Sequence, residues 1–247
     1  PLVVGFTGYG NVSRGAQEIL DLLPVQAISP AELENVAHDR TRDARVVYKV
    51  VFREEDLVEP LEAGNAFDLD DYFRRGKAAY RSVFDRYVDD LSVLVNCVYW
   101  DERYPRLLTL DRCRRLWAPG RSPKLRVIGD ISCDVNGSVE CTVKPTEPGN
   151  PVYVYEPATG KAADGFAGDG PVVMAVEILP SEIPRESSVD FSRVLKRFVP
   201  HLATADLSRR FAELDLPPEL KRAVIVYKGE LTPEYAYLES PLSSRRF

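Results

Sequence analysis

The chain begins with a short apolar run that leads directly into a turn containing two glycines. The run is Leu2–Phe6, and the turn opens with Gly8–Gly10. From Asn11 onward the apolar residues have helical spacing, which ends at Pro24, and a second short apolar run follows at Val25–Ile28. A strand, a glycine turn, a helix and a second strand in this order begin a parallel α/β unit.

Three later runs extend the predicted sheet. Residues 91–95, 125–129 and 172–176 are predominantly apolar, which is typical of strands buried on both faces of a parallel sheet. We therefore predict an α/β fold. It is a Rossmann-like, doubly wound, mostly parallel sheet with an inserted helical segment and a C-terminal helical extension.

The sequence also predicts how the chain is divided. We expect the Rossmann-like lobe to cover residues 1–180 and the helical extension to cover residues 181–247. Residues 31–90 are more charged and less regular, so we expect an insertion there, with a helix near 68–88. The only methionine is Met174, which leads us to expect that the chain is a piece of a longer protein.

Composition excludes several function classes. The 247 residues include 32 basic and 38 acidic side chains, a net charge of −6, which argues against broad binding to nucleic acid or to anionic membranes. No apolar run approaches the roughly 18–20 residues that a membrane span needs. The four cysteines form no CxxC pair and only two histidines could join them, so we expect reduced thiols and no metal site.

The glycine turn has the residues that a dinucleotide fingerprint requires. Gly8 permits the tight turn, and Gly10 leaves the backbone open to a pyrophosphate at the N-terminus of the helix. Ser13 holds the third position, where glycine or alanine is usual. The context favours dinucleotide binding by Gly8, Tyr9, Gly10, Asn11 and Val12, and a purely structural turn is the alternative.

The end of the second strand tests which dinucleotide is bound. Sites that prefer NAD carry an acidic residue there, about 20 residues after the turn, to bind the ribose 2′-hydroxyl. The corresponding residue is Ser29, which would not repel a 2′-phosphate and could donate to one. This substitution favours NADP(H) over NAD(H).

Two aspartates follow another predicted strand. Asp130 and Asp134 come at the end of the run 125–129, where open α/β sheets bind ligands. The alternative is structural: Asp130 could cap a turn, and Asp134 with Asn136 and Gly137 could form one. The sequence alone leaves both interpretations open.

Five segments together resemble a known family. They are PLVVGFTGYGNVSRGAQEIL, LVNCVYWDERYPRLLT, LWAPG, VIGDISCDVNGSVECT and VEILPSEIPRESSVDFS. In this order the chain resembles lysine–ketoglutarate reductase, the saccharopine-forming half of bifunctional α-aminoadipic semialdehyde synthase. The wider relatives are alanine dehydrogenases and transhydrogenases, which have two Rossmann-like lobes, and this chain resembles the nucleotide-binding one.

The resemblance implies a reaction and its partners. Lysine and 2-oxoglutarate would condense, and hydride from NADPH would reduce the imine to saccharopine, in lysine degradation. The acid–base lysine and histidine of the family come from the other lobe, so we expect this chain alone to be inactive or nearly so. The resemblance further implies a saccharopine dehydrogenase domain as covalent neighbour, in the cytoplasm or, in an animal, the mitochondrial matrix.

The resemblance also implies roles for individual residues. The glycine turn matches the family's phosphate turn, and Ser29 matches its ribose-side position. Cys97, Val98 and Tyr99 match a segment that passes the nicotinamide, and Ile178 and Leu179 match a loop that covers it from the other side. Asp130, Ile131 and Ser132 lead into Asp134, which matches an aspartate beside the nicotinamide and the substrate.

A different class of function remains an alternative. The same lobe could be a nucleotide- or amino-acid-binding regulatory module without catalysis. We expect His38 and His201, which lie in no matching motif, to be structural or surface residues, and we expect Tyr99 and Trp100 to be packing residues.

Overall fold

The computed structural model describes residues 1–239 of the chain. It divides into two compact units, Pro1–Leu179 and Pro180–Phe247, and each is considered by itself. The expected end of the extension, residues 240–247, lies outside the described residues. No helix in the described part is both long and apolar enough to cross a membrane.

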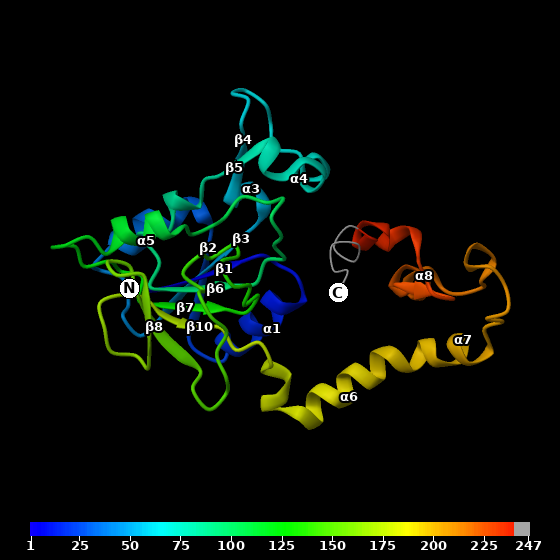
Figure 1. Cartoon of the computed structure of the whole chain (residues 1–247). Helices are drawn as coiled ribbons and strands as arrows, with labels where there is room; N and C mark the ends of the chain where they lie inside the picture. The colour runs from blue at the N-terminus through cyan, green and yellow to red at the C-terminus, as the bar shows by residue number, and fades with distance from the viewer. Residues whose placement is uncertain (240–247) are drawn as a thin grey trace. The chain divides into compact units, whose positions relative to one another are not determined.

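The first unit is built on one large sheet (Figure 1). Within residues 1–239 this sheet has eight strands in the order β2-β3-β1-β6-β7-β10-β8-β9. All neighbours from β2 to β10 are parallel, and β8 and β9 form an antiparallel hairpin at one edge. The strands are β1 Leu2–Thr7, β2 Val25–Ile28, β3 Val47–Phe52, β6 Val93–Asn96, β7 Val127–Asp130, β8 Val152–Glu156, β9 Lys161–Asp164 and β10 Val172–Met174. The mostly parallel Rossmann-like sheet predicted from the sequence is confirmed.

Helices cover both faces of this sheet. Val3 and Val4 alternate along β1 and belong to two different clusters of buried residues, one on each face. Ala16 and Leu20 of α1 pack on the face of Val4, and α2 and α5 contribute to the cluster of Val3. The helices of the unit are α1 Asn11–Leu20, α2 Leu33–His38, α3 Glu54–Leu57, α4 Leu69–Arg75 and α5 Leu110–Leu116.

Residues 31–90 contain more than helices. They supply β3, which the sequence analysis did not predict, and the small antiparallel pair β4 Val58–Pro60 and β5 Tyr80–Ser82. The helix expected near 68–88 is wrong beyond Arg75. Gly76 has a φ of +48°, and a side chain there would lie 2.1 Å from the carbonyl oxygen of Arg103, so the chain turns away at this glycine.

The second unit is mainly helical. Its elements are α6 Pro184–Leu195, α7 Val199–Thr204, α8 Pro218–Ala223 and the short hairpin of β11 Val226–Tyr227 and β12 Glu230–Leu231. The hydroxyl of Tyr227 donates to the carbonyl of Leu207 at 2.7 Å, which ties the hairpin to the loop before α8. No residue of its three helices is fully buried in the described structure.

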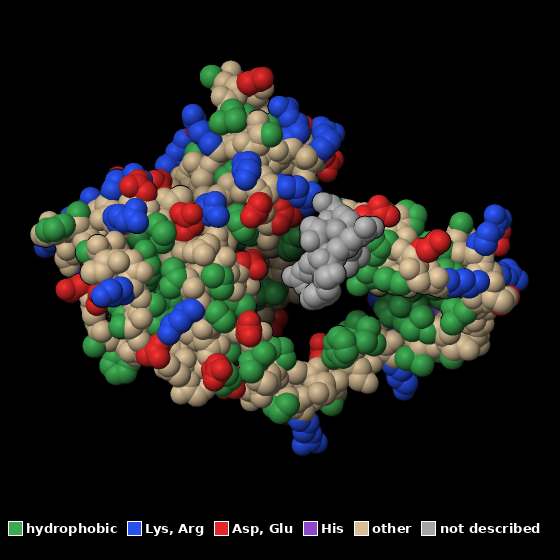
Figure 2. Space-filling model, viewed as in Figure 1, with side chains coloured by type: hydrophobic (Ala, Val, Ile, Leu, Met, Phe, Trp, Pro, Cys, Tyr) green, Lys and Arg blue, Asp and Glu red, His purple; other side chains and the backbone are tan. Residues whose placement is uncertain are grey.

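The visible surface has mixed charge. On the face shown in Figure 2, lysine and arginine side chains are interspersed with aspartate and glutamate. Many charged side chains of the described residues form ion pairs, such as those of Arg81 and Arg86 with Glu59. Such pairs on an exposed surface contribute little to stability.

Candidate functional site

A cavity of about 360 Å³ lies at the glycine turn, at the carboxyl ends of β1, β3 and β6. Open α/β sheets bind their ligands at this edge. The cavity brings together all five residues predicted in the turn and all three predicted after β6. Its lining is Gly8, Tyr9, Gly10, Asn11, Val12, Glu54, Leu57, Tyr72, Phe73, Cys97, Val98, Tyr99, Trp100, Tyr104, Pro105 and Leu107.

Gly8 is required by the backbone. Its φ is +84°, a conformation that other residues rarely adopt, and a side chain there would lie 3.3 Å from the carbonyl oxygen of Cys97. Its N–H donates to the carbonyl of Phe52 at 2.9 Å, and the N–H of Cys97 donates to the carbonyl of Thr7 at 3.1 Å. These bonds hold the turn between the ends of β3 and β6.

Gly10 is not required by the backbone but leaves space open. Its φ is −71° and its ψ is −170°, which any residue adopts. A methyl group on Gly10 would meet no atom of the described residues within 4 Å. Gly10 is also the N-cap of α1, which has no side-chain cap and no acidic residue in its first turn. Free N–H groups and the positive end of the helix dipole therefore meet an unfilled space, which suits a phosphate.

Aromatic side chains form much of the cavity wall. Tyr72 and Tyr104 have ring centroids 5.2 Å apart and are buried. Tyr99 is 79% exposed although it lines the cavity, so the expectation that it is a packing residue is wrong; Trp100 packs against the core and its indole N–H donates to the carbonyl of Tyr104. Flat rings of this kind suit the faces of a nucleobase or a nicotinamide.

Several ionisable groups of the cavity have raised pKa values, and two of them, Cys97 and Tyr9, are residues predicted from the sequence. Burial raises the pKa of the Cys97 thiol to about 11, so this thiol is protonated at neutral pH. The Glu54 carboxylate next to the Tyr9 hydroxyl raises the pKa of that phenol. Neither group is therefore prepared to act as a base.

Asp130 is the centre of a buried polar network below the cavity. Its carboxylate accepts from Asn96 Nδ2 at 2.8 Å, from Thr142 Oγ1 at 2.5 Å and from the N–H of Cys133 at 3.3 Å. Asn96 also accepts from Thr7 Oγ1 at 2.8 Å, so the network joins the carboxyl ends of β1, β6 and β7. Burial raises the pKa of Asp130. With 1% of its surface exposed, Asp130 supports the site without facing it.

Asp134 forms the turn that the structural interpretation of the sequence predicted. It begins a turn in which the N–H of Gly137 donates to its carbonyl at 2.9 Å, and its exposed carboxylate accepts no hydrogen bond from residues 1–239. A side chain on Gly137 would lie 2.5 Å from Asp134 Cβ, so the glycine is needed for this turn. Burial raises the pKa of the Asp134 carboxyl. The turn thus presents an unengaged carboxylate after β7.

Ser29 does not reach the glycine turn. It follows β2, and β3 lies between β2 and β1, so Ser29 is about two strand spacings, roughly 10 Å, to the side. Its hydroxyl donates to Glu32 Oε2 at 2.7 Å, and its N–H donates to the same atom at 2.8 Å. Ser29 therefore caps the following turn, with a carboxylate beside it.

The remaining predicted residues lie outside the cavity lining. Ile131 continues from β7, and its N–H donates to the carbonyl of Asn96 at 3.0 Å. Ser132 Oγ donates to the carbonyl of Val98 at 2.6 Å and so fixes the loop that lines the cavity. Ile178 is half exposed and Leu179 begins a short 3₁₀ turn; both follow β10 at the same edge of the sheet.

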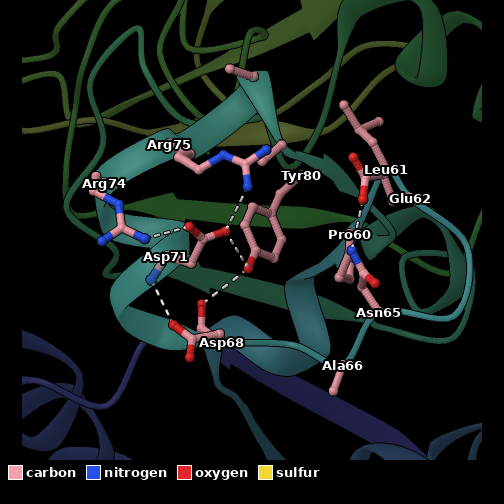
Figure 3. A pocket seen from close by; sticks show the side chains of 12 residues that line it. Pro60, Leu61, Glu62, Asn65, Ala66, Asp68, Asp71, Arg74, Arg75 and Tyr80 are labelled. Atoms are coloured by element: carbon pink, nitrogen blue, oxygen red, sulfur yellow. Dashed lines mark hydrogen bonds and ion pairs between the residues drawn. The ribbon is translucent and has the colours of Figure 1, made fainter.

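A second cavity, of about 450 Å³, is formed by the β4–β5 pair and α4 (Figure 3). Asp71 binds Arg74 at 2.7 Å and Arg75 at 3.3 Å, and the Tyr80 hydroxyl donates to the carbonyl of Asp68 at 3.1 Å. Both arginines of this cavity are thus paired with Asp71 (Figure 3). Because its arginines are already paired, this cavity is a weaker candidate for a ligand site than the cavity at the glycine turn.

Several lining residues of the cavity were not predicted from the sequence. Those that follow β3 are Glu54, Leu57, Tyr72 and Phe73, and those that follow β6 are Tyr104, Pro105 and Leu107. The available signal was Val47–Phe52, in which four of six residues are valine or phenylalanine. Tyr48 and Lys49 interrupt its apolar pattern, and charged residues flank it. Among the described residues no group of His, Cys, Asp or Glu could hold a metal ion.

The comparisons with known proteins first define the class of fold. An L-alanine dehydrogenase structure superimposes on 98% of this chain and 54% of its own, with a TM-score of 0.52 and 17% sequence identity. Together with the sheet order and the glycine turn, this likeness shows a Rossmann-like α/β fold similar to that of the alanine dehydrogenase.

The chain is, more particularly, homologous to one segment of the α-aminoadipic semialdehyde synthases. It is 38% identical to the synthase of Arabidopsis thaliana over 96% of this chain, and 31% identical to the mitochondrial synthase of Bos taurus over 99%. It spans only 23% and 27% of those proteins. A saccharopine dehydrogenase [NAD(+), L-lysine-forming] of Emericella nidulans is 32% identical over 45% of the chain. No family model matches. The resemblance recognised in the sequence is confirmed.

Proposed function

We propose that this chain is the nucleotide-binding lobe of an NADPH-dependent oxidoreductase that condenses lysine with 2-oxoglutarate to saccharopine. The observation that carries the proposal is the open space at Gly10, where the uncapped N-terminus of α1 faces an aromatic-walled cavity. The synthases and dehydrogenases that the chain resembles support an enzyme of this class.

The residues present fit a nicotinamide dinucleotide. The N–H groups of Asn11 and Val12 would hold the pyrophosphate, since the missing Cβ of Gly10 lets it approach the backbone. The aromatic wall would exclude water from the flat rings. The loop Cys97–Tyr99, fixed by Ser132, would border the nicotinamide side. When bound, NADPH supplies the hydride that reduces the imine formed from the two substrates.

A second lobe would complete this site. Cys97 and Tyr9, whose pKa values are raised, are poor acid–base catalysts at neutral pH, and Asp134 is the unengaged carboxylate at the edge. We propose that a lobe encoded outside this chain supplies the acid–base groups and binds lysine and 2-oxoglutarate, and that a saccharopine dehydrogenase domain is its covalent neighbour. In an animal protein we propose the mitochondrial matrix as its location; the bovine relative is named mitochondrial.

Titration of this chain with NADPH tests the proposal. We expect saturable binding, followed by nucleotide fluorescence or calorimetry, and no NADPH oxidation when lysine and 2-oxoglutarate are added. General acid–base catalysis contributes about 10²–10⁴-fold, and that contribution would be absent. Failure to bind either NADPH or NADH would contradict the proposal. Robust saccharopine formation would place the catalytic groups within this chain and contradict the division between lobes.

Asp134→Ala should separate binding from catalysis. Its carboxylate lies after β7, away from the N-terminus of α1, so NADPH affinity should change less than about threefold. In a longer protein with both lobes, we expect activity to fall by about 100-fold or more, because a charge beside the reacting atoms is lost. Steady-state NADPH oxidation measures the effect. Asp134→Asn, which keeps the size of the side chain, tests whether the charge is responsible; full activity in both variants would refute the role.

A further inference from the structure

The strand order changes which residue faces the ribose of a bound dinucleotide. In the usual Rossmann order the second strand lies beside the first, and its last residue meets the ribose 2′ position. Here β3 lies beside β1 and β2 is one place further out. The residue that follows β3 therefore takes the ribose-side position that Ser29 would otherwise hold.

The register of β1 and β3 identifies that residue as Arg53. Thr7 pairs with Phe52, so the next residues along the two strands, Gly8 and Arg53, lie at the same level of the sheet. The hydrogen bond from the Gly8 N–H to the carbonyl of Phe52 fixes this register at the turn itself. The side chain of Arg53 thus starts directly beside the glycine turn.

The Arg53 guanidinium is available for a ligand. Its carbon Cζ lies 5.1 Å from the centre of the Tyr9 ring, within the turn. Arg53 is exposed, and its guanidinium forms no ion pair with any residue in the described part of the chain. Its backbone is held separately, because its N–H donates to Asp56 Oδ2 at 2.9 Å. Arg45, before the other end of β3, pairs instead with the carboxylate of Asp43.

We infer that Arg53 binds the 2′-phosphate of NADP(H) and sets the preference of the lobe for it. This inference rests on the proposed function, since it needs a dinucleotide at the glycine turn. A guanidinium binds a phosphate through two parallel charge-assisted hydrogen bonds, and it stacks on flat rings, as it does here on Tyr9. Arg53 thus replaces Ser29 as the residue that distinguishes the two cofactors.

The opposing group is Glu54, the next residue. It lines the cavity and accepts a hydrogen bond from the Tyr9 hydroxyl. A carboxylate at this level could instead accept from a free ribose 2′-hydroxyl and favour NADH. Arg53 holds the position in register with Gly8, whereas Glu54 is one residue further and already bonded, so the geometry favours the arginine.

The test compares NADPH and NADH affinities of this chain with those of Arg53→Ala. We expect the variant to bind NADPH about 10- to 100-fold more weakly, which is the value of a charge-assisted phosphate contact, and NADH less than about threefold more weakly. Arg45→Ala is the matched control. It removes the same charge near the opposite end of β3, where Arg45 pairs with Asp43, and should change neither affinity. Circular dichroism checks that each variant is folded.

Four results would overturn the inference, and they are distinguishable. Equal weakening of NADPH and NADH by Arg53→Ala, or no weakening of either, would leave the proposed function standing and remove Arg53 as the discriminating residue. A preference for NADH that Glu54→Gln abolishes would assign the ribose to Glu54 instead. If the unaltered chain binds neither dinucleotide, the proposed function falls and the inference falls with it.

Discussion

Replacing Gly10 with valine should abolish dinucleotide binding while the lobe stays folded. The side chain would enter the space beside the first N–H groups of α1, where a pyrophosphate would lie. We expect NADPH affinity to fall by at least about 100-fold, because the phosphates could no longer approach the backbone. The same fluorescence titration used for the unaltered chain measures this loss.

The fold should tolerate Gly10→Val for reasons visible in the backbone. The residue has an extended conformation, and no described atom lies within 4 Å of the added Cβ. The cost is that of a poor N-cap residue, about 1 kcal/mol. Gly15→Ala, in the same helix and also facing open space, is the control: it should stabilise the lobe by about 0.5–1 kcal/mol and leave binding unchanged. Normal NADPH binding by Gly10→Val would show that the turn is only structural.

The elements with strong local signals could be predicted from the sequence. The run Leu2–Phe6 and the helical spacing after Asn11 bracket the glycine turn, and each has a physical cause that acts within a few residues. The positive φ of Gly8 restricts the conformations that the turn can adopt between the strand and the helix. This is why the turn residues lie together at one cavity, as predicted.

The position of β3 beside β1 could not be predicted from local signals. The strand β3 contains Lys49, whose ammonium pairs with Asp21 at 2.6 Å, and it lies in a stretch rich in charge. Charged side chains weaken the apolar signal on which strand prediction depends. Strand order is set by which apolar faces pack together over long distances, and counting from the glycine turn to Ser29 assumed the usual order. Because β3 was missed, Ser29 was expected to lie beside the glycine turn, whereas β3 separates β2 from β1.

The two aspartates show a second limit of sequence reasoning. Asp130 and Asp134 are four residues apart and look alike in the sequence, yet one is buried among donors and the other is exposed. The difference comes from Asn96 and Thr142, which are 34 and 12 residues away from Asp130 and meet it only in the fold. Long-range partners of this kind decide whether a carboxylate supports a site or faces it.

The buried position of Asp130 leads to a large expected effect on stability. Asp130→Ala would leave the Asn96 amide, the Thr142 hydroxyl and the Cys133 N–H without their acceptor. An unsatisfied buried donor costs about 1–3 kcal/mol, and part of this is offset because a buried charge is removed. We expect the free energy of unfolding to fall by about 2–5 kcal/mol, measured by urea denaturation at neutral pH.

Asp130→Asn separates the hydrogen bonds from the charge. The amide oxygen can still accept from Asn96 and Cys133, and the amide nitrogen can donate to a reoriented Thr142 hydroxyl, so we expect a much smaller loss of stability than in Asp130→Ala.

The pH dependence of stability should also differ between the unaltered chain and Asp130→Asn. Burial raises the pKa of Asp130 in the folded protein, so the folded state binds the proton more tightly than the unfolded state does. The contribution of this carboxyl is complete below its unfolded pKa of about 3.9 and is lost as the pH rises through the higher folded pKa. The stability of the unaltered chain relative to Asp130→Asn should therefore decrease as the pH rises from about 4 to neutrality. An increase over that range would mean that hydrogen bonds to the charged form outweigh burial, and would contradict the raised pKa.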